Sequence, residues 1–195
     1  MITRADFDII TSWVAPGARV LDLGCGDGAL LAHLARDKQT KGYGIENDNA
    51  AFLECINNNV NVIQSDLEAG LKEIADASFD VVVLSQTLQA IKHTETVLNE
   101  MLRVGREAIV TFPNFGYWQH RVQIGLFGKM PVSDDLPYQW YNTPNVHLFT
   151  IHDFEKFCTT RGYRINNRRV LAGDREARFL PNLTGTLALY KISLA

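Results

Sequence analysis

The segment from Val20 to Gly28 constrains the fold more than any other part of the chain. It reads V-L-D-L-G-C-G-D-G, an apolar strand that runs into an acidic residue and three alternate glycines, and a helical pattern follows at once. Alternate glycines let the backbone turn tightly and approach a ligand without a Cβ in the way. The following helix then points its N-terminal N–H groups toward that ligand. The segment therefore predicts a strand–loop–helix unit that binds a nucleotide-like cofactor.

The spacing of these glycines favours S-adenosylmethionine over a dinucleotide. In the dinucleotide fingerprint G-x-G-x-x-G, the start of the helix holds a pyrophosphate, whereas here the third glycine comes one residue earlier. Asp22 lies two residues before the first glycine, where a carboxylate repels a pyrophosphate but attracts a sulfonium and an ammonium group. The nine residues resemble the first motif of the seven-stranded S-adenosylmethionine-dependent methyltransferases. The alternative is a plain glycine-rich turn.

The size and charge of the chain narrow the class of protein. Its 195 residues suit one domain, and a domain of that size buries roughly 70% of its unfolded surface. A net charge of −3 gives no electrostatic reason to expect binding to nucleic acid or to a membrane. The three cysteines are widely spaced and form no C-x-x-C pair, which is typical of reduced thiols and predicts a cytoplasmic protein. No signal peptide is recognisable, and no apolar run approaches the roughly 20 residues of a membrane span.

Strand and helix patterns alternate along the chain, as in a parallel sheet covered by helices on both faces. Apolar runs predict strands at 19–23, 42–46, 60–64, 79–84 and 107–112. Apolar stripes predict helices over 5–14, 27–36 and 48–57, from 94 to 105 and from 150 to 162. Residues 163–171 and 183–192 predict a final hairpin. The expected fold class is α/β: a Rossmann-like, seven-stranded methyltransferase fold with a mostly parallel sheet and a C-terminal antiparallel hairpin.

Polar residues mark where two of these helices begin. Asp48 is suited to cap the third helix, whose spacing directs Phe52, Leu53 and Ile56 inward. Thr150 and Asp153 have the spacing of a capping box at the start of the last predicted helix.

The pattern changes after Phe112. From Pro113 to His147 neither period holds, aromatic and proline residues gather, and Gly116–Phe127 is the part suited to an amphipathic helix. We expect this insertion to belong to a single domain, residues 1–195, because no repeat, linker or low-complexity tract divides the chain. It has three interpretations: a lid over the cofactor, a partner-docking surface anchored by its tryptophans and Tyr141, or a subdomain with its own small core.

Ligands bind such sheets at the carboxyl ends of the strands, and polar residues follow several strands here. The resemblance to seven-stranded methyltransferases implies their roles. Glu46 accepts the ribose hydroxyls, Asp66 accepts from the adenine amino group, and a backbone carbonyl at Ser85-Gln86 holds the ammonium group. The alternatives are a solvated strand end for Glu46 and a helix cap for Asp66. The predicted cofactor-binding residues are Asp22, Gly24, Cys25, Gly26, Gly28, Glu46, Asn47, Asp66, Leu67, Ser85 and Gln86.

The sequence does not identify a catalytic residue. Methyl transfer from a sulfonium depends mainly on alignment and proximity, which supply on the order of 7–11 kcal/mol, and a base is needed only when the acceptor must lose a proton. The candidate bases are His93, His120, His147 and His152, none of which is convincing. The spacing of His147, His152 and Cys158 matches no familiar metal site, so no metal is expected.

Blocks beyond the glycine loop carry a closer resemblance. They are Leu84–Gln89 (L-S-Q-T-L-Q), Phe112–Gly116 (F-P-N-F-G), Met130–Val132 (M-P-V) and Leu136–His147 (L-P-Y-Q-W-Y-N-T-P-N-V-H). Together they resemble the MetW family of methionine biosynthesis proteins over essentially the whole chain. The resemblance implies a methyltransferase-like fold, a place in methionine biosynthesis, and homoserine O-acyltransferase as a partner, the enzyme that activates homoserine before sulfur is incorporated. It implies no particular methyl acceptor.

Three functions follow as hypotheses. The favoured one is a protein that binds S-adenosylmethionine or S-adenosylhomocysteine and supports or regulates homoserine O-acyltransferase, with the cofactor as an end-product signal. The second is a small-molecule methyltransferase in its own right. The third is a dinucleotide-dependent oxidoreductase, which rests only on the generic strand–glycine–helix pattern. Binding of S-adenosylmethionine separates the third hypothesis from the other two.

Overall fold

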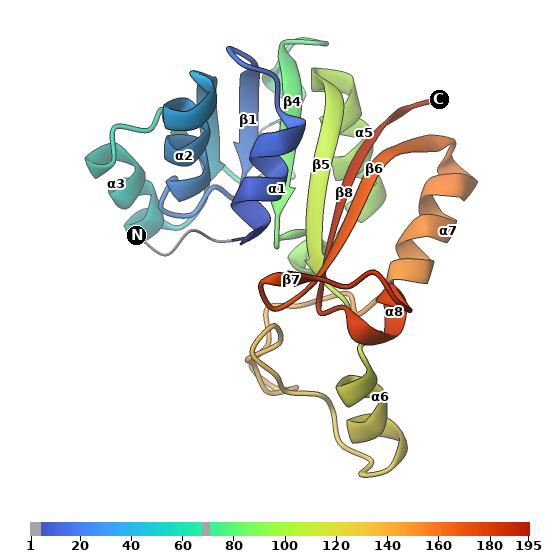
Figure 1. The fold of residues 1–195 in the computed structure, drawn as a ribbon. Coiled ribbons are helices and arrows are strands. Elements are labelled where there is room, and N and C mark those ends of the chain that lie inside the picture. Colours follow the sequence, from blue (N-terminus) through green and yellow to red (C-terminus); the bar gives the residue numbers. More distant parts are fainter. Residues whose placement is uncertain (1–4, 68–70) are drawn as a thin grey trace.

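The computed structural model describes residues 5–67 and 71–195, and their strands form one eight-stranded sheet with helices on both faces (Figure 1). The strands are β1 (Arg19–Leu23), β2 (Lys41–Glu46), β3 (Val62–Gln64), β4 (Phe79–Ser85), β5 (Gly105–Pro113), β6 (Tyr163–Ala172), β7 (Arg175–Glu176) and β8 (Leu187–Leu194). The helices are α1 (Ala5–Trp13), α2 (Ala29–Lys38), α3 (Asn49–Asn57), α5 (Thr94–Val104), α6 (Trp118–Gly125), α7 (Ile151–Arg161) and α8 (Pro181–Thr184), with short 3₁₀ helices η1 (Leu71–Glu73) and η2 (Leu88–Ala90).

The sheet has the strand order β3-β2-β1-β4-β5-β8-β6-β7. The first five strands in this order run parallel, whereas β8 lies antiparallel to both β5 and β6. The predicted mostly parallel α/β sheet with a C-terminal antiparallel hairpin is therefore confirmed. The two-residue strand β7 extends this seven-stranded arrangement at one edge.

The prediction that the last strand begins at Leu183 is wrong. Residues Pro181–Thr184 form α8, and β8 begins only at Leu187. Proline suits the first position of a helix because its fixed φ is helical and its missing N–H has no partner to lose there. Pro181 occupies that position, so the apolar residues after it enter a helical turn before the strand starts.

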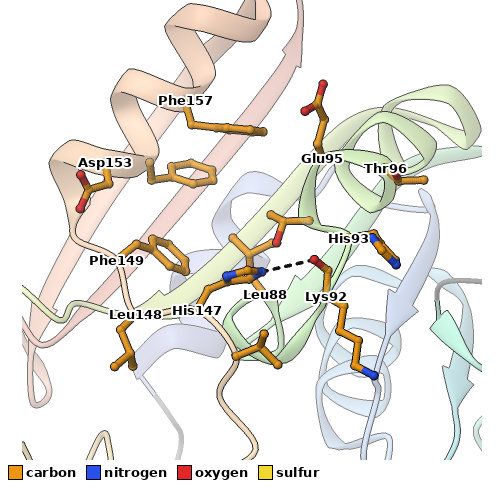
Figure 2. A pocket seen from close by; sticks show the side chains of 13 residues that line it. Leu88, Lys92, His93, Glu95, Thr96, His147, Leu148, Phe149, Asp153 and Phe157 are labelled. Atoms are coloured by element: carbon orange, nitrogen blue, oxygen red, sulfur yellow. Dashed lines mark hydrogen bonds between the residues drawn. The ribbon is translucent and has the colours of Figure 1, made fainter. Parts of the chain in front are cut away.

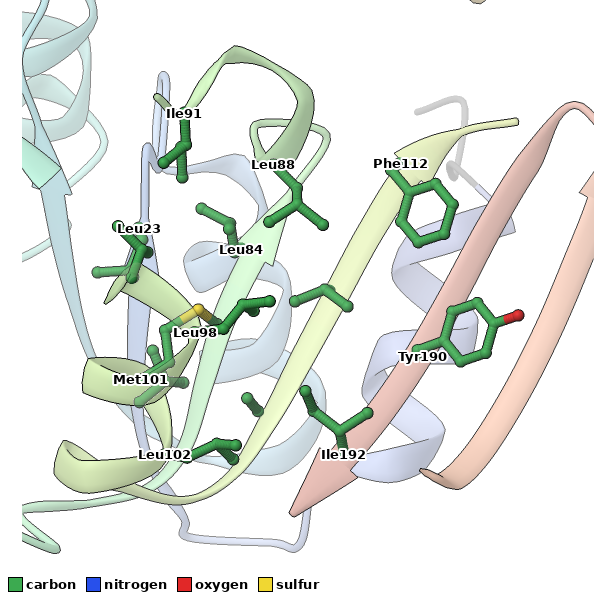
Figure 3. Packing of buried hydrophobic residues seen from close by; sticks show 14 of the residues in the cluster. Leu23, Leu84, Leu88, Ile91, Leu98, Met101, Leu102, Phe112, Tyr190 and Ile192 are labelled. Carbon is green, nitrogen blue, oxygen red and sulfur yellow. The ribbon is translucent and has the colours of Figure 1, made fainter. Parts of the chain in front are cut away.

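Alternate strand residues point into two apolar clusters, one on each face of the sheet. One cluster joins the strands to α5 and α7, and the other joins them to α1, α2 and Cys55 of α3. Figure 3 shows part of the first cluster, in which the rings of Phe112 and Tyr190 stack with centroids 5.9 Å apart. The predicted inward face of α5 is confirmed as Val97, Leu98, Met101 and Leu102.

The predicted inward face of α3 is wrong. Leu53 and Ile56 are 59% and 51% exposed, Phe52 is half-buried, and Cys55 is the buried residue. Because the main contacts of α3 are with β2 and the short strand β3 at the edge of the sheet, the helix buries one narrow row of side chains. The helix start is as predicted, since the Asp48 side chain accepts from two backbone N–H groups.

Residues 116–147, which we call the arm, project from the body of the molecule between β5 and α7 (Figure 1). Their helix, α6, is shorter than the predicted span of Gly116–Phe127. The arm returns to the body at α7, which begins with the predicted Thr150–Asp153 capping box and ends at Gly162 in the left-handed conformation.

A buried asparagine fixes the point where the arm leaves the body. Asn114 is fully buried, and its Nδ2 donates to Gly185 O and Asn182 O at 2.9 and 3.2 Å. Its Oδ1 accepts from Gly116 N and Ile151 N at 3.0 and 3.3 Å. One side chain thus joins both legs of the arm to the segment around α8.

Candidate functional site

The glycine loop follows β1 and adopts the conformation that its sequence predicts. Gly24, Gly26 and Gly28 have φ values of +68°, +58° and +77°, in the left-handed region that favours glycine. Gly24 N donates to Ile45 O across 2.8 Å, which ties the loop to the end of β2. A Cβ at Gly28 would lie 2.8 Å from Val60, whereas one at Gly26 would meet no atom of the described residues within 4 Å. Gly26 therefore faces open space and lets a ligand approach the backbone.

Glu46, at the end of β2, holds this loop. Its carboxylate accepts from Gly26 N at 2.9 Å and from Asn47 N and Asp48 N at 2.8 Å each. These bonds use three of the roughly four acceptor positions of a carboxylate. Glu46 can therefore accept one ribose hydroxyl directly, and a second only if a backbone donor is released. The structure therefore leaves Glu46 one acceptor position for a ribose hydroxyl, whereas the sequence-based prediction was that it accepts both hydroxyls.

Cys25 lies within the loop but turns its side chain into the protein. Its Sγ lies 3.6 Å from Cys55 Sγ, and the Cys55 thiol donates to Gly26 O across 3.0 Å. Burial, followed by the nearby Asp22 carboxylate, raises the pKa of the Cys25 thiol, so it stays protonated. Cys25 therefore offers a ligand its backbone, while its thiol packs α3 against the loop.

Carboxylates surround the glycine loop with negative charge. Asp22 is 2% exposed at the end of β1, where the strand lies between β2 and β4. Burial raises the pKa of the Cys55 thiol, the hydrogen bond with Cys25 opposes this, and the carboxylates of Asp27, Glu46 and Asp22 raise it further. Such a field favours a cationic ligand group and disfavours a phosphate. The residues present therefore fit a sulfonium cofactor better than a dinucleotide.

The end of β4 brings a second polar segment to the same edge of the sheet. Gln86 has a positive φ of 51°, a conformation that is strained for a residue with a Cβ. Its N–H donates to Thr111 O across 3.0 Å, and its carbonyl accepts from Gln89 Nε2 across 2.7 Å. The Ser85 carbonyl accepts from the Thr87 hydroxyl across 2.9 Å. A carbonyl oxygen has two lone pairs, so an ammonium donor at Gln86 is compatible with the bond from Gln89.

Thr87 is a site residue that the sequence did not predict. A Cβ at Gly24 would lie 3.1 Å from Thr87 Oγ1 and 3.6 Å from Leu67 Cδ1, so segments after β1, β3 and β4 meet at this glycine. The available signal was that Thr87 directly follows the two predicted residues at the end of β4. The alternative role of Asp66, as the cap of a following helix, depends on residues 68–70, which lie outside the described residues.

A separate cavity of about 710 Å³ lies between α5 and α7 (Figure 2). Its apolar wall includes Phe149, Phe154 and Phe157. At its rim, His147 Nε2 lies 3.3 Å from Lys92 O. Leu88 of η2 also lines the cavity and directly follows Thr87, which lies beside Gly24, so the cavity and the glycine loop are adjacent at the start of this short helix. None of the predicted cofactor-binding residues is among those that line it.

The four candidate bases lie at other points of the structure. His93 and His147 line the cavity between α5 and α7, and His152 is exposed in the first turn of α7. His120 is buried in the arm with Nε2 3.0 Å from Ser133 Oγ, and burial lowers its pKa. The arrangement therefore assigns no base to the glycine loop.

Two further observations bear on the class of site. Within residues 5–67 and 71–195, no group of three or more His, Cys, Asp and Glu side chains is placed to hold a metal ion. In the same part of the chain, no helix combines the length and the apolar character that a membrane crossing requires.

The chain is similar to known proteins in sequence. The profile of the family described as "Methionine biosynthesis protein MetW" matches residues 4–192. The bifunctional methionine biosynthesis protein MetXA/MetW of Rhodopirellula baltica is 40% identical over an alignment of 159 residues, and the match covers 77% of this chain and 26% of that protein. The chain thus spans about a quarter of the length of the curated relative it matches.

Solved structures show a similar fold at low sequence identity. A putative S-adenosylmethionine-dependent methyltransferase from Listeria monocytogenes superposes with a TM-score of 0.71 and 16% identity, covering 98% of this chain and 97% of its own. An S-adenosylmethionine-dependent methyltransferase from Mesorhizobium loti gives a TM-score of 0.70 and 14% identity, covering 96% and 97%. These likenesses establish the Rossmann-like methyltransferase fold, and the sequence match establishes the family. The chain belongs to the MetW family of methionine biosynthesis proteins.

Proposed function

We propose that this protein binds S-adenosylmethionine or S-adenosylhomocysteine at the glycine loop and supports or regulates homoserine O-acyltransferase in methionine biosynthesis. The observation that carries the proposal is the loop itself, which faces open space at Gly26 and is surrounded by carboxylates. S-adenosylmethionine is a cation derived from methionine, so this loop suits a sensor of the end product of the pathway. When bound, the cofactor supplies a transferable methyl group or serves as that signal.

The residues of the chain would hold the cofactor as follows. Asp22 attracts the positively charged sulfonium and ammonium groups, and Gly26 allows close approach to the backbone. Glu46 accepts a ribose hydroxyl, and Asp66 accepts from the adenine amino group. The carbonyl of Gln86 receives the ammonium group. The other predicted residues, Gly24, Cys25, Gly28, Asn47, Leu67 and Ser85, shape the loop and the strand ends around it.

The link to the acyltransferase is supported by the composition of the relative. The relative is named as a bifunctional MetXA/MetW protein, and the match to this chain covers 26% of its length. Two proteins that are fused share a fixed stoichiometry and a high effective concentration, of the order of millimolar for short flexible linkers. The two parts of such a protein are expected to meet through a binding surface. The three cysteines are free thiols, which supports a reducing compartment such as the cytoplasm.

A second candidate function is methyl transfer to a small molecule. The observation that favours it is the cavity of about 710 Å³ that is adjacent to the glycine loop at the start of η2. Its phenylalanine wall would suit an acceptor with an apolar portion. His93 and His147, two of the candidate bases, line this cavity and lie where such an acceptor would bind.

Acyltransferase activity tests the proposed function. Purified homoserine O-acyltransferase from the same organism is assayed alone and with increasing amounts of this protein, with and without S-adenosylmethionine. We expect the protein to raise the activity and the cofactor to change the size of that effect. Activity that stays the same at saturation, in both conditions, would contradict the proposal. Release of S-adenosylhomocysteine in the same mixtures measures the second candidate function directly.

A further inference from the structure

The arm exposes large apolar side chains to solvent. Trp140, Tyr141, Leu126 and Phe127 are 72%, 70%, 78% and 67% exposed. Further apolar side chains of the arm that are more than a third exposed are Trp118, Ile124, Met130, Tyr138 and Val146. A subdomain that packs its own core would bury such residues, and exposed patches of this kind mark interaction sites. The arm therefore presents its aromatics outward.

Hydrogen bonds hold the arm in a defined shape. The Gln123 side chain bonds both N and O of Val132, at 3.0 and 3.3 Å, which fastens α6 to the returning chain. At the base of the arm, Val146 N and His147 N donate to Gln89 O at 2.8 and 3.0 Å. A scaffold that is ordered before binding loses less conformational entropy on association. The exposed aromatics are thus presented on a preorganised support.

The arm also offers a concave surface beside these aromatics. A cavity of about 740 Å³ is lined by Phe127 and Met130 after α6, and by Trp140 from the returning chain. The rest of its lining is mostly polar or backbone, including Gln123 and Gln139. Interface hot spots pair an aromatic anchor with a pocket on the other side. The arm carries both features within the same few residues.

The charge of the arm identifies the kind of partner. Residues 116–147 contain two basic residues, Arg121 and Lys129, and two acidic ones, Asp134 and Asp135. Arg121 turns toward the body, where it donates to Gly116 O and Asn182 O at 2.6 and 3.3 Å. Nucleic acid and anionic membranes are bound through clustered positive charge, which the arm does not offer. Protein interfaces are instead rich in tryptophan, tyrosine, phenylalanine and methionine and poor in charge at their centre.

We propose that the arm is the surface through which this protein docks onto homoserine O-acyltransferase, by inserting Trp140, Tyr141 and Phe127 against an apolar, uncharged face of that enzyme. The inference rests on the proposed function, since the fused relative supplies the partner. A second copy of this chain is the competing occupant. The geometry assigns the arm to docking rather than to a lid, because its largest aromatics face solvent.

The test compares two double variants for binding to the purified acyltransferase by titration calorimetry. The first, Trp140→Ala with Tyr141→Ala, removes the arm's anchors. The matched control, Leu53→Ala with Ile56→Ala, removes apolar side chains of similar exposure, 59% and 51%, from α3 at the far edge of the sheet. We expect the arm variant to bind on the order of 10- to 100-fold more weakly and the control to bind like the wild type.

Several outcomes would overturn the docking inference. If the arm variant binds the acyltransferase as tightly as the wild type, or if only the control binds more weakly, the interface lies outside the arm. Dimers of the wild-type protein that the arm variant abolishes, with unchanged acyltransferase binding, would assign the arm to self-association. If the wild type raises acyltransferase activity and the arm variant does so equally at limiting concentration, the docking inference fails while the proposed function stands. If the wild type neither binds nor affects the enzyme, both fail.

Discussion

At the scale of single residues, the structure depends on side chains whose role the sequence does not reveal. The glycine loop was predictable because glycine spacing and a nearby carboxylate act locally. Asn114 was not, because its four partners come from three separate segments of the chain. The inward face of α3 was predicted wrongly for a related reason: helical spacing gives a stripe, but which stripe is buried depends on how much sheet lies beneath the helix. The two exposed residues, Leu53 and Ile56, show this.

Replacing Asn114 tests the role of its buried amide. Asn114→Leu keeps the approximate volume but leaves buried backbone groups without partners, so we expect a loss of about 3 kcal/mol or more in the free energy of unfolding. Asn166→Leu is the control, because Asn166 is exposed and makes a surface bond to Glu107; its cost should be below about 1 kcal/mol. Denaturant unfolding measures both. Similar costs for the two variants would contradict the role given to Asn114.

His120 makes the arm sensitive to acid. Burial lowers its pKa below the ordinary 6.5, so below pH 6.5 the unfolded chain takes up the proton before the folded protein does. Stability is therefore full above pH 6.5 and falls as the pH drops from 6.5 through the lowered pKa. In His120→Gln, which does not titrate, we expect a smaller loss of stability between pH 7 and 5. An unchanged dependence of stability on pH in His120→Gln would refute the assignment.

At the scale of elements, the strands were predictable and the arm was not. The run F-D-V-V-V-L is typical of a parallel strand that is buried on both faces, and β4 forms over these residues. The sequence of the arm shows neither helical nor strand periodicity. Its shape depends instead on bonds between side chains and backbone groups that are distant in the sequence. The element that joins the arm to the cofactor site is η2. The Gln89 carbonyl accepts from Val146 N and His147 N of the returning leg of the arm, and the Gln89 side chain donates to Gln86 O.

This junction predicts coupling between cofactor and partner. Gln89→Ala removes the side-chain bond to Gln86 but keeps the backbone carbonyl that holds the arm. We expect the partner to bind the variant as well as the wild type in the absence of S-adenosylmethionine, and the change in partner affinity caused by the cofactor to shrink. Titrations with and without cofactor measure this, with the exposed Gln39→Ala as control. Linkage requires the partner to change cofactor affinity by the same factor. If the cofactor changes partner affinity in Gln89→Ala as much as in the wild type, coupling through the Gln89 side chain is excluded.

At the scale of the whole molecule, the sheet places the predicted cofactor residues and the base of the arm at the same end (Figure 1). Parallel strands bring their carboxyl ends to one edge, so residues far apart in sequence become neighbours without any local signal. This explains why the fold class followed from the sequence, whereas the binding roles of the predicted cofactor residues stay predictions. The number of donors on Glu46, the place of Thr87 and the direction of the arm's aromatics required the three-dimensional structure.

The central claim is that the glycine loop binds S-adenosylmethionine, and one set of calorimetric titrations tests it most directly. Wild type is compared with Gly26→Ala and Gly173→Ala, two glycines with φ of +58° and +60° around which a Cβ meets no described atom within 4 Å. The free energy of unfolding should fall by a similar amount in both variants, about 1–2 kcal/mol, which is the cost of placing a residue with a Cβ in the left-handed conformation. We predict micromolar binding by wild type and Gly173→Ala, and at least ten-fold weaker binding by Gly26→Ala alone. No binding of S-adenosylmethionine or S-adenosylhomocysteine by the wild type would contradict the account and leave the loop as a structural scaffold.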